Sequence, residues 1–355
     1  MATTTINLNI AKEWYTVGTT GADYTTIQAA VNDGKEKLKL ITDITTSSDV
    51  TLPADFSLVV DLNGFICTFG LNVKMISDAT NKVKFTSYSG YRDGEFIFST
   101  DINNFRGVGT ASQSIAENIV IRNTSTVNLT GNLAYFFLNN KNLTYYFPNA
   151  EDHAITNAEG CDLIAGGTSC KWLFAGEGNL NTIKDCNILG ASKGDFIGRA
   201  TYLINCKFLL STFFRVMVYT LASNVTSNGN GRIEVFENAS NIYDFDRITM
   251  RDNSQIDNFS CGQLGFRNRT NIKAFNGVCE VSPNGGGGNT VLLNGITSLS
   301  NIDINNVDYC TVVNCTCVDF KITPNSDFTV VRNLQYTGTA TDNSLTTRIF
   351  ETFLN

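Results

Sequence analysis

The sequence predicts an all-β fold, a right-handed parallel β-helix with a short N-terminal capping α-helix. The main observation is a pattern that occurs twice, since residues 181–188 (NTIKDCNI) align with residues 201–208 (TYLINCKF) at an offset of twenty positions. This period is too long for a hairpin and lacks the helix of a βαβ unit, but it suits one turn of a β-solenoid. Short β-prone runs between Gly, Asn, Ser and Asp clusters recur along the chain and favour the same fold.

The N-terminal region, residues 1–37, is predicted to hold a short strand and the capping helix. In residues 21–34 (GADYTTIQAAVNDG), Thr25 and Gln28 have the spacing of a capping box, and Gly34 stands where a helix end favours a left-handed residue. Without such an element, the first coil of a solenoid would expose its core and its strand edges to water.

Residues 38–323 are predicted to form the β-helix itself. Asparagine recurs directly before an apolar residue at Asn118, Asn142, Asn241, Asn271 and Asn301. Turn asparagines on successive coils can stack in a hydrogen-bonded ladder, and asparagine tolerates the left-handed backbone of a tight corner.

Residues 324–355 differ in composition from the rest of the chain. They are rich in threonine, contain no cysteine, and end in the apolar sequence TRIFETFLN. Apolar side chains at one end of a solenoid need a cover, so this segment is predicted to be a C-terminal cap or an oligomerisation tail.

Composition limits the class of partner. Of the 355 residues, 42% are hydrophobic and 17% are charged, and the formal net charge is −7. No run of Lys or Arg is long enough to follow a phosphate backbone, so neither nucleic acid nor an anionic membrane surface is an expected partner. The sequence has no basic segment followed by an apolar stretch at its start and no long apolar span, so neither a signal peptide nor a transmembrane segment is expected.

The ten cysteines are predicted to be reduced and to point inward, as Cys186 and Cys206 do in the repeated pattern. The alternative is a zinc site at Cys310, Cys315 and Cys317, although their spacing is not that of a CxxC pair and no histidine accompanies them. No metal and no cofactor are therefore expected.

The segment 23–31 (DYTTIQAAV) resembles the entry segment of the pectate-lyase-like superfamily. This superfamily includes pectin methylesterases, polysaccharide lyases and many viral tailspikes and fibres. The resemblance implies a right-handed parallel β-helix, in which this segment caps the solenoid and carries no chemistry.

A second resemblance concerns a possible catalytic residue. Residues 195–200 (DFIGRA), followed by Asn205 and Cys206, are similar to the pectin methylesterase block in which Asp-Phe-Ile-Phe-Gly-Asn-Ala precedes Asn-Cys. The resemblance implies a catalytic role for Asp195, with a second aspartate one coil earlier and an arginine downstream. Here the nearest earlier carboxylate is Glu177, and residues 264–269 (LGFRNR) match the arginine block only distantly. The alternative is that Asp195 is a turn residue.

A second group of acidic residues lies further along the chain. Asp244, Asp246 and Asp252 are close in sequence to Arg247 and Arg251. Paired carboxylates of this kind are what glycoside hydrolysis uses, and the alternative is a solvated strand face. Because His153 is the only histidine, the chain has no second imidazole with which to build a histidine-dependent triad elsewhere.

Two functions are compatible with these features. The first is a non-enzymatic structural protein of a virus or phage particle, such as a capsid decoration, spike or fibre component, with possible binding of a host-surface glycan. Its expected partners are copies of itself, as a trimer by analogy with spikes, and other virion proteins; its expected location is the virion, assembled in the host cytoplasm.

The alternative is a polysaccharide-active enzyme of tailspike type, a lyase, hydrolase or carbohydrate esterase. Its catalytic residues would come from Asp195, Arg199, Asp244 and Asp246, and basic residues such as Arg215 would hold an acidic glycan. The two functions differ in one structural feature, the convergence of two carboxylates and a basic residue on one lateral groove.

Overall fold

The structure is a computed structural model of residues 1–355, and it divides into two compact units that are described separately. The first unit comprises Met1–Ser125 with Ala134–Thr144, and the second comprises Thr126–Leu133 with Tyr145–Asn355. The structure describes residues 13–354 except 71–72, 74, 77–79, 90, 99–114, 125–138, 148–151, 156, 166–170, 175–180, 191–195, 212, 252, 268–270, 282–289, 306, 308, 325, 327 and 344–347. The predicted divisions at residues 37 and 323 do not coincide with the bounds of these units.

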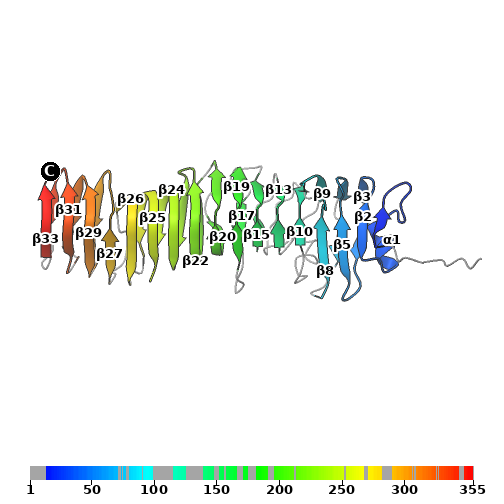
Figure 1. Ribbon diagram of the computed structural model, residues 1–355, viewed down its shortest axis with the longest axis horizontal. Coiled ribbons are helices and arrows are strands. Elements are labelled where there is room, and N and C mark those ends of the chain that lie inside the picture. Colours follow the sequence, from blue (N-terminus) through cyan, green and yellow to red (C-terminus); the bar gives the residue numbers. More distant parts are fainter. Residues whose placement is uncertain are drawn as a thin grey trace, which may run out of the picture. The chain divides into compact units, whose positions relative to one another are not determined.

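The first unit is a right-handed parallel β-helix built from three ladders of parallel strands (Figure 1). The first ladder contains β1 (Tyr15–Val17), β2 (Lys37–Leu40), β5 (Ser57–Asp61), β8 (Lys82–Thr86), β10 (Ile115–Glu117) and β12 (Asn139–Lys141). The second contains β3 (Ile44–Thr46), β6 (Ile66–Phe69), β9 (Gly94–Phe98) and β11 (Ile119–Asn123), and the third contains β4 (Val50–Thr51) and β7 (Met75–Ile76).

The second unit repeats this architecture with longer strands that bend through corners and so serve more than one ladder. Its shorter strands are β14 (Asp152–Ile155), β15 (Asn157–Glu159), β16 (Asp162–Ala165), β17 (Lys171–Phe174), β18 (Thr182–Lys184), β19 (Asn187–Gly190), β21 (Lys207–Leu210), β23 (Gly231–Val235), β27 (Val291–Asn294), β28 (Asn301–Ile304), β30 (Asp319–Ile322) and β32 (Ala340–Asp342), and β13 (Thr144–Phe147) begins at the last residue of the first unit. Its longer strands are β20 (Phe196–Ile204), β22 (Phe214–Ser227), β24 (Asn238–Met250), β25 (Gln255–Phe266), β26 (Ile272–Val281), β29 (Cys310–Cys317), β31 (Val330–Tyr336) and β33 (Arg348–Leu354).

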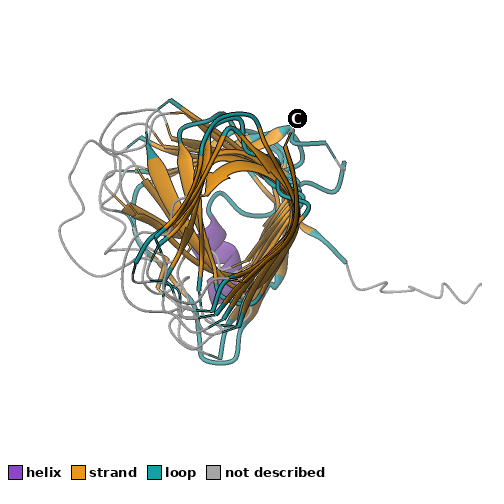
Figure 2. Cartoon of the chain, turned by 90° about the vertical axis from the view of Figure 1, so that its left-hand side faces the viewer, coloured by secondary structure: helices purple, strands orange, loops and turns teal. Residues whose placement is uncertain are grey.

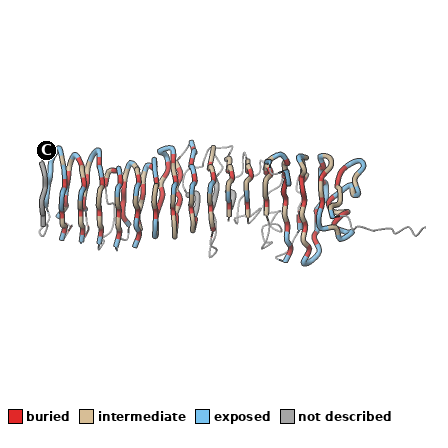
Figure 3. Tube along the Cα trace, viewed as in Figure 1, coloured by how far each residue is buried: buried red, intermediate tan, exposed pale blue. Residues whose placement is uncertain are grey.

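The strand register confirms the repeat from which the fold was predicted. Ile183 pairs with Leu203 on the next coil, and Ile188 pairs with Phe208. All four side chains are fully buried, and buried and exposed residues alternate along the strands (Figure 3). Inward residues of a solenoid stack on those of the next coil, so one continuous core forms within the unit.

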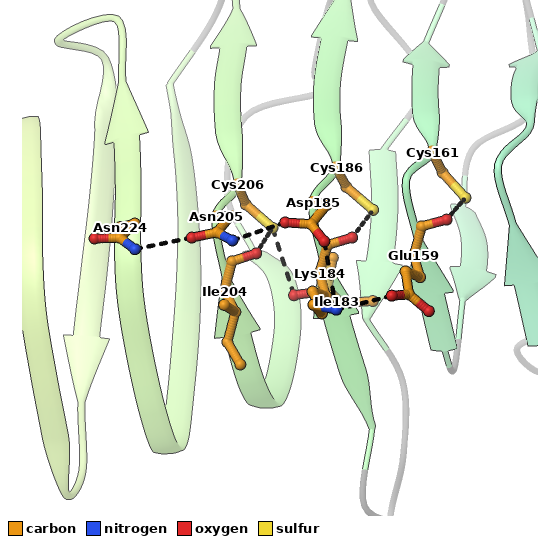
Figure 4. Close-up of polar contacts among 10 residues, drawn as sticks. All are labelled: Glu159, Cys161, Ile183, Lys184, Asp185, Cys186, Ile204, Asn205, Cys206 and Asn224. Atoms are coloured by element: carbon orange, nitrogen blue, oxygen red, sulfur yellow. Dashed lines mark hydrogen bonds and ion pairs between the residues drawn. The ribbon is translucent and has the colours of Figure 1, made fainter.

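Left-handed asparagines form the corners of successive coils, as predicted. The residues with positive φ at this corner are Asn118 and Asn142 in the first unit, and Asp185, Asn205, Asn224, Asn241, Asn258, Asn276, Asn314 and Asn333 in the second. The Asn205 amide donates to Asp185 at 2.7 Å, and the Asn224 amide donates to Asn205 at 2.9 Å (Figure 4). Asn271 is left-handed at a different corner, and the prediction is wrong for Asn301, which begins strand β28.

Four buried cysteines, Cys161, Cys186, Cys206 and Cys315, directly follow a residue with positive φ. Of the nine cysteines that the structure describes, all are free thiols and only Cys261 is partly exposed. Each of four thiols donates to the carbonyl two residues earlier, at 3.1–3.3 Å: Cys161 to Glu159, Cys186 to Lys184, Cys206 to Ile204 and Cys315 to Val313. Figure 4 shows the first three of these hydrogen bonds. Burial raises the pKa of Cys315 to about 11, so its thiol stays protonated at neutral pH and remains a donor.

The predicted capping helix is present as α1 (Ile27–Asn32), the helix drawn in purple in Figure 2. Its N-cap is Thr26 and not Thr25, because the Thr26 hydroxyl accepts the Ala29 N–H at 3.1 Å. The Gln28 side chain turns away from a capping box and accepts the Thr51 N–H of β4 at 2.6 Å. This bond joins the helix to the first coil.

No helix among the described residues has the length and apolarity needed to cross a membrane.

The C-terminal segment continues the strand ladder of the second unit beyond residue 323. Strand β31 pairs with β29, and β33 pairs with β31 from Val330↔Arg348 to Tyr336↔Leu354. The predicted boundary at residues 323 and 324 therefore does not interrupt the solenoid. A role of residues 324–355 in capping or oligomerisation stays a prediction.

Two glycines make room for phenylalanine rings inside the second unit. Phe214 pairs with Gly231, and Phe259 pairs with Gly277 on the next coil. A Cβ atom added at either glycine would overlap the tip of the paired ring. The core of this solenoid thus places a large residue over a residue without a side chain.

Candidate functional site

The predicted site residues fall into different parts of the second unit. Asp195 and Asp252 lie outside the described residues. Arg199 is exposed on β20, where it pairs with Met217 of β22. Asp244 and Asp246 are exposed residues of β24. The catalytic role that the resemblance implies for Asp195 stays a prediction.

Three arginines lie side by side on neighbouring strands and form what we call the arginine row. Arg215 of β22 pairs with Arg232 of β23, which pairs with Arg247 of β24. Neighbouring strands are about 4.8 Å apart, so the row places cations at that interval along the solenoid. The row borders a groove of about 270 Å³, which is lined by Arg215, Arg232, Glu234, Arg247, Thr249, Gly265, Phe266 and Arg267.

Among the described residues that line this groove, Glu234 is the one carboxylate, and it is already bound by arginine side chains. Its side chain is 7% exposed, and it accepts hydrogen bonds from Arg215 and from Arg251, whose Nε lies 2.9 Å from Oε2. A buried carboxylate needs such paired charges to offset the cost of leaving water. Each of its two carboxylate oxygens is therefore bound by a guanidinium group.

Aromatic rings lie against two of these guanidinium groups, those of Arg232 and Arg251. The Arg232 guanidinium lies 4.7 Å from the centre of the Phe213 ring, and the Arg251 guanidinium lies 5.2 Å from the centre of the Phe236 ring. The Phe236 ring stacks in turn on Tyr219 at 4.5 Å. Such contacts fix the direction of an arginine side chain and lower the entropy that it loses on binding an anion.

Two arginines of the groove, Arg247 and Arg267, form no ion pair with the residues that the structure describes. Arg247 donates to the neutral amide oxygen of Gln263. Arg267 is exposed, and no ion pair to it is found among the described residues. The groove therefore carries net positive charge on a protein whose formal net charge is −7.

A larger pocket adjoins the groove and contains the two predicted aspartates. It has a volume of about 690 Å³ and is lined by Ser227, Asn228, Gly229, Asp244, Phe245, Asp246, Ser260, Cys261, Gly262 and Val278. Asp244 has a left-handed backbone (φ 63°), and its N–H donates to the Ser260 hydroxyl at 3.2 Å. Asp246 forms an ion pair of 3.1 Å with Arg232, so this ion pair joins the pocket to the arginine row.

The structure separates residues that are neighbours in the sequence. Phe245 and Ile248 are buried, while Asp246 and Arg247 between them both point outward. Two consecutive outward residues mark a corner of the coil, so Asp246 faces the pocket and Arg247 faces the groove. The predicted cluster of aspartates and arginines is thus divided between two hollows.

Arg232, Glu234 and Arg267 were not among the predicted site residues. A signal for the row exists in the sequence, because residues 215–218 (RVMV), 232–235 (RIEV) and 247–250 (RITM) share an arginine followed by alternating apolar positions. Its spacing of 17 and then 15 residues is irregular, which hides it from a search for a fixed period.

Among the residues that the structure describes, no three His, Cys, Asp or Glu side chains gather so that they could hold a metal ion. This includes Cys310, Cys315 and Cys317, the alternative zinc ligands, all of which are buried in the core.

Comparison with protein-family models, with curated proteins and with solved structures finds no match for this chain. The function is therefore inferred from the arginine row, the groove and the pocket.

Proposed function

We propose that the protein is a non-enzymatic, glycan-binding structural protein of the kind that forms virus or phage spikes, fibres or capsid decorations, and that the groove beside the arginine row binds an acidic polysaccharide. The observation that carries the proposal is the row itself, with Arg215, Arg232 and Arg247 in register on three strands. The virion assignment rests on the solenoid fold and on the resemblance of its entry segment.

The ligand class follows from the shape of the cationic surface. A uronate or sulfate polysaccharide is an extended chain with anionic groups at regular intervals, and the row is an extended line of guanidinium groups. Guanidinium binds carboxylate and sulfate through paired N–H donors, which are stronger than neutral hydrogen bonds. Arg247 and Arg267 supply these donors, because neither is neutralised by a carboxylate within the described residues.

A binding rather than a catalytic role is supported by the contacts of Glu234. General acid–base catalysis needs a carboxyl group within hydrogen-bond reach of the reacting bond. Both oxygens of Glu234 are already bound by Arg215 and Arg251, so this buried carboxylate serves to position cations.

Arg247→Ala and Arg267→Ala are each expected to weaken the binding of polygalacturonate oligomers about tenfold, since each removes charge-assisted hydrogen bonds. Isothermal titration calorimetry at two salt concentrations measures the affinity and its salt dependence. In both variants the affinity should be lower and should depend less on salt. Lys207→Ala is the matched control, because it removes one exposed cation of β21 that does not line the groove. Equal affinities for all four proteins would contradict the proposal.

A second candidate function, a polysaccharide-active enzyme, is favoured by the larger pocket. Asp244 and Asp246 both line it, and Arg232 approaches it through the ion pair with Asp246. Two carboxylates and a basic residue at one hollow are the arrangement expected of an enzyme. Both aspartates are exposed, and Asp246 is already held by its ion pair with Arg232. We therefore place this function second.

A further inference from the structure

A separate hollow in the first unit has aromatic walls. It has a volume of about 360 Å³, lies on the outer side of β2 and β5, and is lined by Glu13, Trp14, Lys37, Lys39, Val59, Asp61 and Tyr88. The indole of Trp14 and the ring of Tyr88 are 5.4 Å apart at 76°, so their planes meet nearly at right angles. Tyr88 is 57% exposed, so its ring is accessible to a ligand.

Hydrogen bonds hold the Tyr88 loop in position over the sheet. The Tyr88 N–H donates to Asp61 Oδ1 at 3.2 Å, and the Asp61 side chain is only 4% exposed. Further along the loop, the hydroxyls of Ser87 and Ser89 both donate to Asp93 Oδ1. The hydrogen bond from Ser87 lowers the pKa of Asp93, so this loop anchor stays ionised at neutral pH. The aromatic wall is therefore in place before a ligand arrives.

The charged groups around the hollow pair with one another. Lys37 lies 3.1 Å from Glu13, and Lys39 lies 3.8 Å from Asp61. With two cations and two anions, the lining has no net charge. The pairs offer N–H donors and carboxylate acceptors side by side, which suits hydroxyl groups better than it suits an ion.

Lysines already lie over both aromatic rings. Lys37 Nζ lies 6.0 Å from the centre of the Trp14 ring, and Lys84 Nζ lies 5.4 Å from the centre of the Tyr88 ring. A cation is therefore already present at each ring, so the rings are not a free cage for a quaternary ammonium group.

From these contacts we infer that the hollow of Trp14 and Tyr88 binds an uncharged hexose ring of an oligosaccharide. The C–H face of a pyranose is apolar and packs against an aromatic ring, while its hydroxyls meet the paired Lys and Glu or Asp groups at the rim. The two rings at right angles contact a face and an edge of one sugar ring. Val59 forms an apolar part of the lining.

The inference goes beyond the proposed function, because it concerns the other unit and a ligand without charge. It can therefore be tested independently of the arginine row. Acidic and neutral oligosaccharides tell the two sites apart, since a neutral chain offers no anion to Arg247 and Arg267.

The experiment titrates the full chain with cellohexaose, isomaltohexaose and laminarihexaose, and follows indole fluorescence and binding heat. At least one of the three is expected to bind and to shift the Trp14 emission; Trp172 is the chain's other tryptophan, so Trp14→Phe identifies the source of the signal. Tyr88→Ala should weaken binding at least tenfold. Tyr91→Ala is the matched control, because Tyr91 is 76% exposed on the same loop and does not line the hollow.

Two results would overturn the inference: no binding of any of the three hexamers at millimolar concentration, or equal affinities of the Tyr88→Ala and Tyr91→Ala variants. Far-ultraviolet circular dichroism and the melting temperature show whether each variant is folded. The Arg247→Ala/Arg267→Ala double variant should bind the neutral hexamer as the unaltered chain does. Weaker binding of the neutral hexamer by this double variant would assign the neutral sugar to the groove and would also overturn the inference.

Discussion

Glu234→Ala is expected to lower the free energy of unfolding by about 3–5 kcal/mol, because it leaves buried positive charge without a partner. Glu234 is bound by Arg215 and Arg251, and the Arg251 side chain is only 14% exposed. Neither arginine can lose its proton to escape the cost of burial. Glu234→Gln keeps an acceptor but not the charge, so its loss should be intermediate. Urea unfolding followed by circular dichroism measures all three stabilities.

Glu237→Ala provides the control for this measurement. Glu237 is exposed three residues further along the same coil, and its backbone carbonyl, not its side chain, accepts the Gln255 N–H. Its replacement should change the free energy of unfolding by less than about 0.5 kcal/mol. If Glu234→Ala were as stable as Glu237→Ala, the ion pairs described around Glu234 would not exist in solution.

Gly231→Ala should destabilise the second unit by about 1–3 kcal/mol, because the added methyl group overpacks the core. Its Cβ would overlap the Phe214 ring, which is fully buried and stacks on Phe208 at 4.9 Å. A stacked ring in a filled core has little room to move aside. Thermal unfolding of the variant gives the size of the loss.

Phe214→Leu tests the cause of that loss. The shorter side chain makes room for the methyl group, so the double variant should lose less stability than the sum of the two single variants. Strict additivity, or a Gly231→Ala variant as stable as the unaltered chain, would show that the two residues do not share one space.

The core of the fold was predictable because inward residues repeat from coil to coil. Ile183 and Leu203 stand twenty residues apart and pair in the structure. The corner asparagines were predictable for a related reason, since only asparagine, aspartate and glycine readily adopt a left-handed backbone. Burial and backbone geometry each restrict residue type strongly, so they leave a pattern in the sequence.

The functional surfaces lack such restrictions, and the sequence predicted them only in part. Asp244 and Asp246 were predicted and share a pocket, but Arg247 turned out to face a different hollow. Outward side chains are not restricted by packing in the core. If a corner of the coil is one residue longer or shorter, the residues after it point to a different face of the solenoid. Trp14 and Tyr88 meet because a loop after β8 reaches across the sheet, and no periodicity predicts such a contact.

We propose that the groove of the second unit binds an acidic polysaccharide without cleaving it. The most direct measurement incubates the purified chain with polygalacturonate and with methyl-esterified pectin, and follows complex formation, polymer length and released methanol together. We expect a complex to form while the polymer length and the degree of esterification stay unchanged. Shortening or de-esterification that Asp244→Asn or Asp246→Asn abolishes would contradict it and assign the function to the larger pocket.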